Sequence, residues 1–209
     1  GGTAFGFRNP EYAFGRTPVE RPLDGPGDLL YVPRIVTSFD LSDAQTLVVG
    51  ASGAAGPNAS GSDTQTRIYG VDTYWKWKSP KAHGGFPFFA WQTEAMYRDY
   101  EAGADPETDL PEETLTDSGL YSQVLWGFQK GWMVGLRGDY VAGDDGEADP
   151  ADVHRGERER VAPNVTWYPT EFSKLRLQYN FDRGDRFGDE QSVWCQAEFL
   201  LGSHGTHKF

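Results

Sequence analysis

Residues 191–201 read QSVWCQAEFLL and alternate strictly between two kinds of side chain. The apolar set comprises Val193, Cys195, Ala197, Phe199 and Leu201. The opposing set comprises Ser192, Trp194, Gln196 and Glu198. A period of two residues predicts a β-strand with one apolar and one polar face. The same parity continues to an aromatic residue at the end of the chain, Phe209.

Eight further segments show strand-like patterns, and the clearest is 174–182. There Leu175, Leu177 and Tyr179 face one way while Lys174 and Arg176 face the other. The remaining strands are expected at residues 31–41, 46–52, 69–77, 89–97, 123–129, 134–139 and 161–167. Residues 46–52 give the least decisive pattern because they are small and mixed. The chain is therefore predicted to be all-β, with about nine strands.

Composition excludes several classes of protein. The mean hydropathy is −0.59, and no run of eighteen apolar residues exists, which excludes a membrane-spanning helix. A membrane barrel is compatible with this value because only every second strand residue meets lipid. The net charge of −12 argues against nucleic acid as a partner. The single cysteine, Cys195, cannot form an internal disulfide.

Strand length and connection length favour a transmembrane barrel over a soluble β-sandwich, which could show the same alternation. Most segments contain nine or more residues, which is the reach that a tilted membrane strand needs. Short connections at 42–44, 130–131 and 168–173 alternate with long ones at 53–63, 101–117 and 143–157. The connection at 79–86 is longer than this rhythm requires. We predict an antiparallel up-and-down transmembrane β-barrel, with short periplasmic turns and long outer loops.

The expected topology has an odd strand count. If the last strand runs toward the periplasm and ends at Phe209, each earlier strand alternates in direction. Residues 183–190 and the three long connections then lie on the outer side of the membrane. Residues 1–28 are then a Pro/Gly-rich outer loop or the remnant of a preceding strand near Thr3–Phe7, and residues 29–209 hold the strands. Bacterial single-chain barrels have even strand numbers, and bare edges are not tolerated in lipid. We therefore expect the chain to be part of a larger barrel.

Several phrases point to a known group of proteins. They include LVVGASGAAGPN at 47–58, IYGVDTYWKWK at 68–78, WQTEAMYR at 91–98, WMVGLRGDYVAG at 132–143 and residues 161–185 and 192–209. From residue 29 to 209, the chain resembles the C-terminal half of plug-less Gram-negative outer-membrane barrels, known as porin-like proteins or zinc-regulated TonB-dependent receptors. The resemblance implies a bacterial outer-membrane barrel for passage or uptake of solutes, and it supplies no catalytic residues. Neither a TonB box nor a plug domain is visible.

The polar strand faces carry charges of both signs. The predicted lumen-lining residues are Arg34, Asp40, Asp72, Lys76, Glu94, Arg98, Arg137, Asp139, Lys174, Arg176 and Glu198. In a wide barrel such residues line the channel and tune the charge of the permeant. Pairing across neighbouring strands is the alternative role. The mixed signs argue against a strongly anion-selective channel.

The tryptophans and Tyr168 are expected to lie at membrane interfaces. Trp75, Trp77, Trp91, Trp126, Trp132 and Trp167 mostly fall near predicted strand ends, where aromatic girdles form. Trp194 is expected to point inward, where it could form a carbohydrate platform.

Two groups of residues are weak metal candidates. The loop at 143–157 carries Asp144, Asp145, Glu147 and Asp149, but their spacing differs from the twelve-residue calcium loop. A solvated acidic loop, screened by divalent ions that bridge lipopolysaccharide, is the favoured interpretation. His204 and His207 are three apart, so on a strand they point to opposite faces, and His83 and His154 lie elsewhere. We expect no metal and no cofactor.

The functional prediction is a weakly selective outer-membrane barrel through which small polar solutes or ions pass. Expected partners are outer-membrane lipid, lipopolysaccharide, the outer-membrane assembly machinery and small solutes, and association into oligomers is compatible with this architecture. The alternatives are a TonB-linked receptor component, an outer-membrane hydrolase and a soluble β-sandwich binding module. The hydrolase is disfavoured because no histidine lies at mid-strand beside a serine. The chain is therefore predicted not to be an enzyme.

Overall fold

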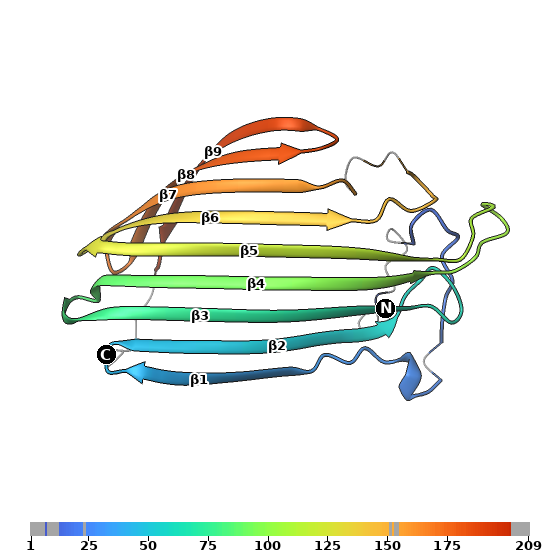
Figure 1. The fold of residues 1–209 in the computed structure, drawn as a ribbon, viewed down its shortest axis with the longest axis horizontal. Coiled ribbons are helices and arrows are strands. Elements are labelled where there is room, and N and C mark those ends of the chain that lie inside the picture. The colour runs from blue at the N-terminus through green and yellow to red at the C-terminus, as the bar shows by residue number, and fades with distance from the viewer. Residues whose placement is uncertain (1–6, 8–12, 23, 151, 153–154, 202–209) are drawn as a thin grey trace.

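A computed structural model describes residue 7 and residues 13–22, 24–150, 152 and 155–201. These residues form one antiparallel sheet of nine strands, in which neighbours in sequence are neighbours in space (Figure 1). The strands are β1 (Arg34–Ser42), β2 (Gln45–Pro57), β3 (Gln65–His83), β4 (Phe86–Ala102), β5 (Glu113–Gln129), β6 (Trp132–Gly143), β7 (Arg158–Thr170), β8 (Ser173–Gly184) and β9 (Gly188–Phe199). A short 3₁₀-helix, η3 (Pro26–Asp28), precedes them. No helix of the described residues is long and apolar enough to cross a membrane.

The prediction of an all-β chain with nine up-and-down strands is confirmed. The strands are longer than their alternation indicated. Part of the expected long connection at 53–63 is strand, because Ala54 to Pro57 of β2 pair with Gln65 to Ile68 of β3. In the same way, Glu101 of β4 pairs with Thr114 of β5 inside the segment expected as a loop. Backbone pairing continues there although the apolar alternation has ended.

The expectation of a long connection at 79–86 is wrong. β3 continues to His83 and β4 begins at Phe86, so the turn contains only Gly84 and Gly85. Both glycines have positive φ, at 58° and 86°. Two such residues suit the tight hairpin turns that match the twist of flanking strands.

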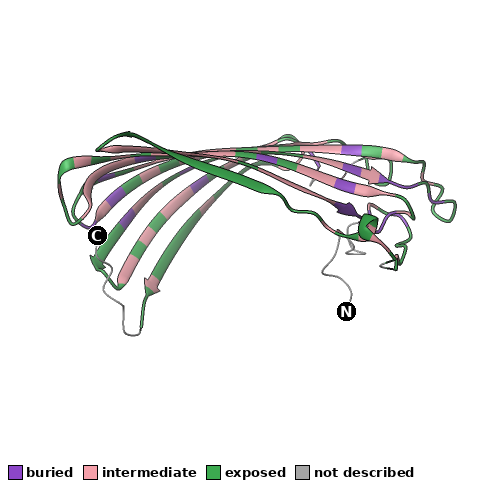
Figure 2. Cartoon of the chain, turned by 90° about the horizontal axis from the view of Figure 1, so that it is seen from below, coloured by how far each residue is buried: buried purple, intermediate pink, exposed green. Residues whose placement is uncertain are grey.

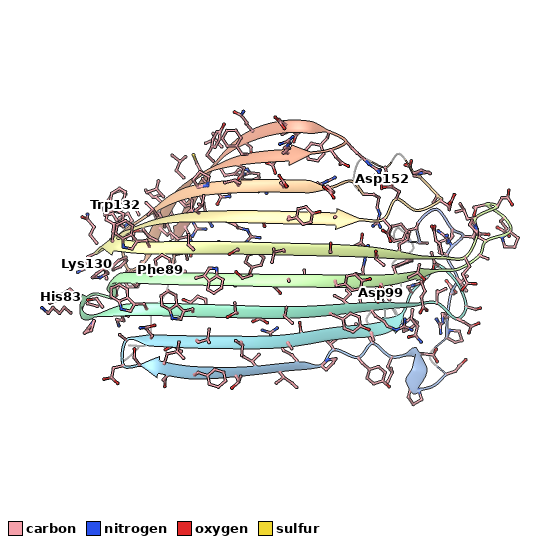
Figure 3. All side chains as sticks on the ribbon, viewed as in Figure 1. His83, Phe89, Asp99, Lys130, Trp132 and Asp152 are labelled. Atoms are coloured by element: carbon pink, nitrogen blue, oxygen red, sulfur yellow. The ribbon has the colours of Figure 1, made fainter. Side chains whose placement is uncertain are left out.

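The two ends of the sheet therefore differ sharply. At one end, all four connections contain two residues, at 43–44, 84–85, 130–131 and 171–172. At the opposite end the connections are 58–64, 103–112, 144–157 and 185–187. We call these the short-turn end and the long-loop end. His83 and Lys130 mark the first, and Asp99 and Asp152 lie toward the second (Figure 3).

The sheet is not closed. Among the described strands, β1 pairs only with β2 and β9 pairs only with β8, which leaves two open edges. Phe7 forms a parallel bridge with Asn58, and its N–H donates to the carbonyl of Pro57 at 2.8 Å. The rest of the expected partner strand near Thr3–Phe7 lies outside the described residues, as does Phe209.

The sheet is curved (Figure 2), and the strands that bend away from its flatter part are β7 to β9, as labelled in Figure 1. Buried strand residues such as Ala90, Met133, Ala162, Thr166 and Asn180 all belong to the polar side of the alternation. Crowding on this side identifies it as the concave face, because curvature brings its side chains together. The convex face exposes large apolar residues, including Ile35 with 76% of its surface accessible.

A small core lies on the concave face at the long-loop end. It consists of Tyr100, Ala102 and Leu115, with Phe14 packed against it. Tyr100 and Leu115 are directly paired residues of β4 and β5. The segment before β1 is therefore folded onto the concave side of the sheet.

Candidate functional site: the charged concave face

The register places all the predicted lumen-lining residues on the concave face. Directly paired residues of an antiparallel sheet share a face, and alternate residues of each strand do as well. The pairings of all nine strands assign this face to Arg34, Asp40, Asp72, Lys76, Glu94, Arg98, Arg137, Asp139, Lys174, Arg176 and Glu198. Trp194 lies on the same face, opposite Gln178, with 64% of its surface accessible.

One row of this face crosses most of the sheet at a single level. Following the pairings from β2 to β9, its members are Gly50, Asp72, Glu94, Tyr121, Asp139, Arg160, Asp182 and Glu190. Five of the eight are carboxylates, and we call this set the acidic row. Rings of charged side chains at one level are a common way in which pores select ions.

Arginines partly neutralise the acidic row. Arg34 reaches Asp72 at 2.9 Å, and Arg160 pairs with the directly opposite Asp182 at 2.6 Å. Arg137 binds Asp139 at 2.5 Å and lies over the ring of Tyr121, with its guanidinium carbon 4.0 Å from the centroid. The row therefore keeps more carboxylates than the cations that reach it.

Other charged residues of the concave face bind partners on neighbouring strands, which is the alternative role predicted for them from sequence. Lys174 binds the directly opposite Glu198 at 2.6 Å, and Arg98 forms a short ion pair with Asp117. Arg176 donates from its Nε to the Thr166 hydroxyl at 3.0 Å. A concave-face position and cross-strand pairing thus coexist in the same side chains.

Sequence reasoning missed Asp117, Tyr121, Arg160 and Glu190 as members of this face. From sequence, Asp117 belongs to the expected long connection at 101–117 and Glu190 to the expected outer loop at 183–190, because the apolar alternation stops short of them. The strand pairing, which single-strand patterns do not contain, brings Arg160 opposite Asp182 and Asp139.

The convex face carries an apolar band bounded by aromatic residues. Trp75, Trp77, Trp91, Trp126, Trp132 and Trp167 all lie in its short-turn half, with Trp132 and Trp167 stacked at 5.6 Å. Toward the long-loop end, Tyr69 and Tyr97 are directly paired. Trp77 and Tyr69 are eight residues apart on β3, which corresponds to about 26 Å along the strand. Within these limits, the described convex-face residues of β3 and β4 carry no charge.

Two of the weak metal candidates, Asp144 and Asp145, have carboxylates that bind other groups of the protein. Asp144 accepts hydrogen bonds from the Thr116 hydroxyl at 2.7 Å and the Thr116 N–H at 2.8 Å, and these bonds lower the pKa of its carboxyl. Asp145 forms a short ion pair with Arg186, and the Glu147 N–H points at Glu113. Within the described part of the chain, no three His, Cys, Asp or Glu side chains are grouped so that they could hold a metal.

The histidines give no further site. His83 is exposed beside the Gly84–Gly85 turn. His154, His204 and His207 lie outside the described residues, so their expected positions remain predictions.

The β2–β3 connection is held in place by a buried asparagine. Asn58 is fully buried, and its amide oxygen accepts bonds from the Ser60 N–H at 2.9 Å and from the hydroxyls of Ser60 and Thr64, both at 2.7 Å. Its amide nitrogen donates to the carbonyl of Glu101 at 2.9 Å. The β2–β3 connection is thereby tied to the end of β4.

Comparison with known proteins shows a similarity to a longer bacterial protein. No protein-family model matches the chain, and no solved structure matches it. An uncharacterized protein of Aquifex aeolicus (strain VF5) is 28% identical over an alignment of 210 residues. The alignment covers 89% of this chain. The chain spans 42% of that relative's length.

Proposed function

We propose that this chain forms part of the wall of a bacterial outer-membrane β-barrel, with its convex face in lipid and its concave face lining a water-filled lumen. The observation that carries this proposal is the separation of faces. A charge-free apolar band with aromatic borders lies on one side, and the acidic row lies on the other. Transmembrane barrels have this arrangement, whereas a soluble sheet buries its apolar face against other elements.

The asymmetry of the ends supports the same proposal. Two-residue turns at one end and long connections at the other are typical of barrels with a periplasmic and an outer side. The open edges of β1 and β9 require further strands to satisfy their backbone groups in lipid. A relative that is more than twice as long as the aligned chain is compatible with a larger barrel.

The proposed mechanism is diffusion of small polar solutes or ions along the concave face. No chemical step is assigned. The acidic row and the carboxylates of the long loops favour the approach of cations over anions, while the paired arginines limit this selectivity. Lipid and lipopolysaccharide are the proposed surroundings of the convex face and the long loops.

The experiment is conductance of the complete protein that contains this chain, reconstituted in a planar bilayer. We expect discrete conductance steps with a reversal potential that favours cations. A protein that dissolves without detergent, remains folded and produces no steps in the bilayer would contradict the proposal.

A further inference from the structure

The segment before β1 contains an aromatic residue held in an unusual conformation. Phe14 has φ of 50°, in the left-handed region that bulky residues rarely adopt, and Gly15 follows at 76°. Such a conformation persists only where the surroundings fix it. Here the ring of Phe14 meets the ring of Tyr100 edge-on, at a centroid distance of 4.7 Å.

Two arginines, one from the sheet and one from a loop, lie over the half-buried ring of Phe14. The guanidinium carbon of Arg155 lies 5.1 Å from the ring centroid, and that of Arg98 lies 5.8 Å from it. Both arginines bind the same carboxylate, Asp117 of β5. The aromatic side chain is therefore held by groups from β4, β5 and the β6–β7 connection.

Arg16 anchors the same segment more deeply. Its side chain is 0% exposed, and its Nε donates to the carbonyl of Gly103 at 2.6 Å. One of its terminal nitrogens, Nη2, donates to the carbonyl of Pro111 and to the carboxylate of Glu113, both at 2.8 Å. A buried charge is tolerated only when it is paired and hydrogen-bonded, and Arg16 meets both conditions.

Thr17 adds a third attachment. Its N–H donates to the carboxylate of Asp105 at 2.6 Å, and the N–H of Glu107 donates to the same side chain at 2.9 Å. Both Arg16 and Thr17 are therefore hydrogen-bonded to the β4–β5 connection. All these contacts lie at the long-loop end on the concave side of the sheet.

We propose that residues 13–17 form an inward-folded latch that narrows the mouth of the passage at the long-loop end and sets the size of solute that enters. This inference rests on the proposed function. It follows from the placement of the segment on the concave face, where the solute would pass, and from its attachment to three separate elements. Release of the latch leaves Tyr100 and Leu115 facing a wider opening.

The test combines a structural readout with a transport readout. Phe14→Ala removes the half-buried ring, and we expect trypsin cleavage after Arg16 to rise by about tenfold, since the buried Arg16 side chain becomes accessible. In liposome swelling with sugars of graded size, we expect the variant to admit larger sugars than the native protein does.

Phe187→Ala is the matched control. Phe187 also lies at the long-loop end beneath an arginine, with Arg158 at 5.0 Å, but it belongs to the β8–β9 connection. We expect native cleavage and native size limits from it. If Arg16 stays protected in Phe14→Ala, the double variant Phe14→Ala with Glu113→Ala removes the counter-charge as well, and continued protection there would overturn the latch.

The outcomes separate the two proposals. Release of Arg16 with an unchanged size limit in a conducting protein would overturn the latch alone. An absence of passage in the native protein and in both variants would overturn the proposed function together with the latch.

Discussion

The carboxylate of Asp72 on β3 lies directly over Gly50 on β2. An ideal Cβ at Gly50 would stand 2.9 Å from the Cγ of Asp72, which is closer than real Cβ atoms approach. The absence of a side chain at Gly50 lets Arg34 on β1 reach across β2 and bind Asp72 at 2.9 Å. A glycine on the concave face thus permits an ion pair between strands that are not neighbours.

Gly50→Ala is expected to displace Asp72 and to weaken its pair with Arg34. The Asp72 side chain has to turn aside, and the loss of its partly exposed pair with Arg34 is expected to cost about 1 kcal/mol of unfolding free energy. Gly119→Ala is the control. Gly119 also lies on the concave face, but a Cβ added there would be 3.9 Å from its nearest neighbours. Urea unfolding followed by tryptophan fluorescence in detergent would measure both. Equal stability of the two variants would contradict the role assigned to Gly50.

A charge placed on the convex face should disturb membrane folding far more than one on the concave face. Val71→Arg puts a charge in the apolar band and is expected to cost about 2–4 kcal/mol of folding free energy in lipid vesicles. Met96→Arg is the control, since Met96 is similarly exposed, at 52% against 58% for Val71, but lies on the concave face. Folding yield in vesicles distinguishes them, and similar losses in both would argue against a lipid-facing convex face.

Reversal of one charge in the acidic row should change ion selectivity. Glu94→Lys is expected to lower the cation-to-anion permeability ratio several-fold, as measured from the reversal potential. The reason is that Glu94 lies between Asp72 and Tyr121 in that row. Asp99→Lys, on the convex side of the same strand, serves as control (Figure 3). An equal shift from both variants would mean that the row does not line the path.

Docking of residues 13–17 should withstand mild acid. The N–H of Thr17 and then that of Glu107 stabilise the Asp105 carboxylate, so its pKa lies well below the ordinary value of about 3.9. A depressed folded-state pKa adds stability above the unfolded value and loses it as pH falls through the folded value. Hydrogen exchange of residues 13–22, corrected for intrinsic rates, should therefore be unchanged between about pH 8 and pH 5. Asp105→Ala should raise the exchange rate of these residues at every pH. A change in the exchange rate of the native protein with a midpoint between about pH 8 and pH 5 would contradict the low pKa of Asp105.

The fold was largely predictable from sequence because alternation identifies each strand independently. All nine strands were expected, and every predicted lumen-lining residue lies on one face. Strand ends were not predictable. Glu101 pairs with Thr114, and Asp117 pairs with Arg98, in parts of β4 and β5 where the apolar pattern is absent. The turn at Gly84–Gly85 was missed because the polar residues beside it resemble a loop.

The acidic row and the packing of Phe14 lay beyond sequence reasoning for a different reason. The row depends on the register of eight strands, and a shift of one residue would move its members to the opposite face. The packing of Phe14 joins residues separated by more than eighty positions. No local pattern encodes either relationship.

The central claim concerns which face meets water and which meets lipid, and single-cysteine labelling along β4 tests it most directly. In a Cys195→Ser background, cysteines at successive positions from 91 to 97, none of which is buried, are treated in proteoliposomes with a water-soluble maleimide. In parallel, a fluorophore at each position is quenched by brominated lipid. The proposal predicts that even positions react with the maleimide and odd positions are quenched by lipid. Equal maleimide labelling at both parities, with no lipid quenching at either, would contradict it.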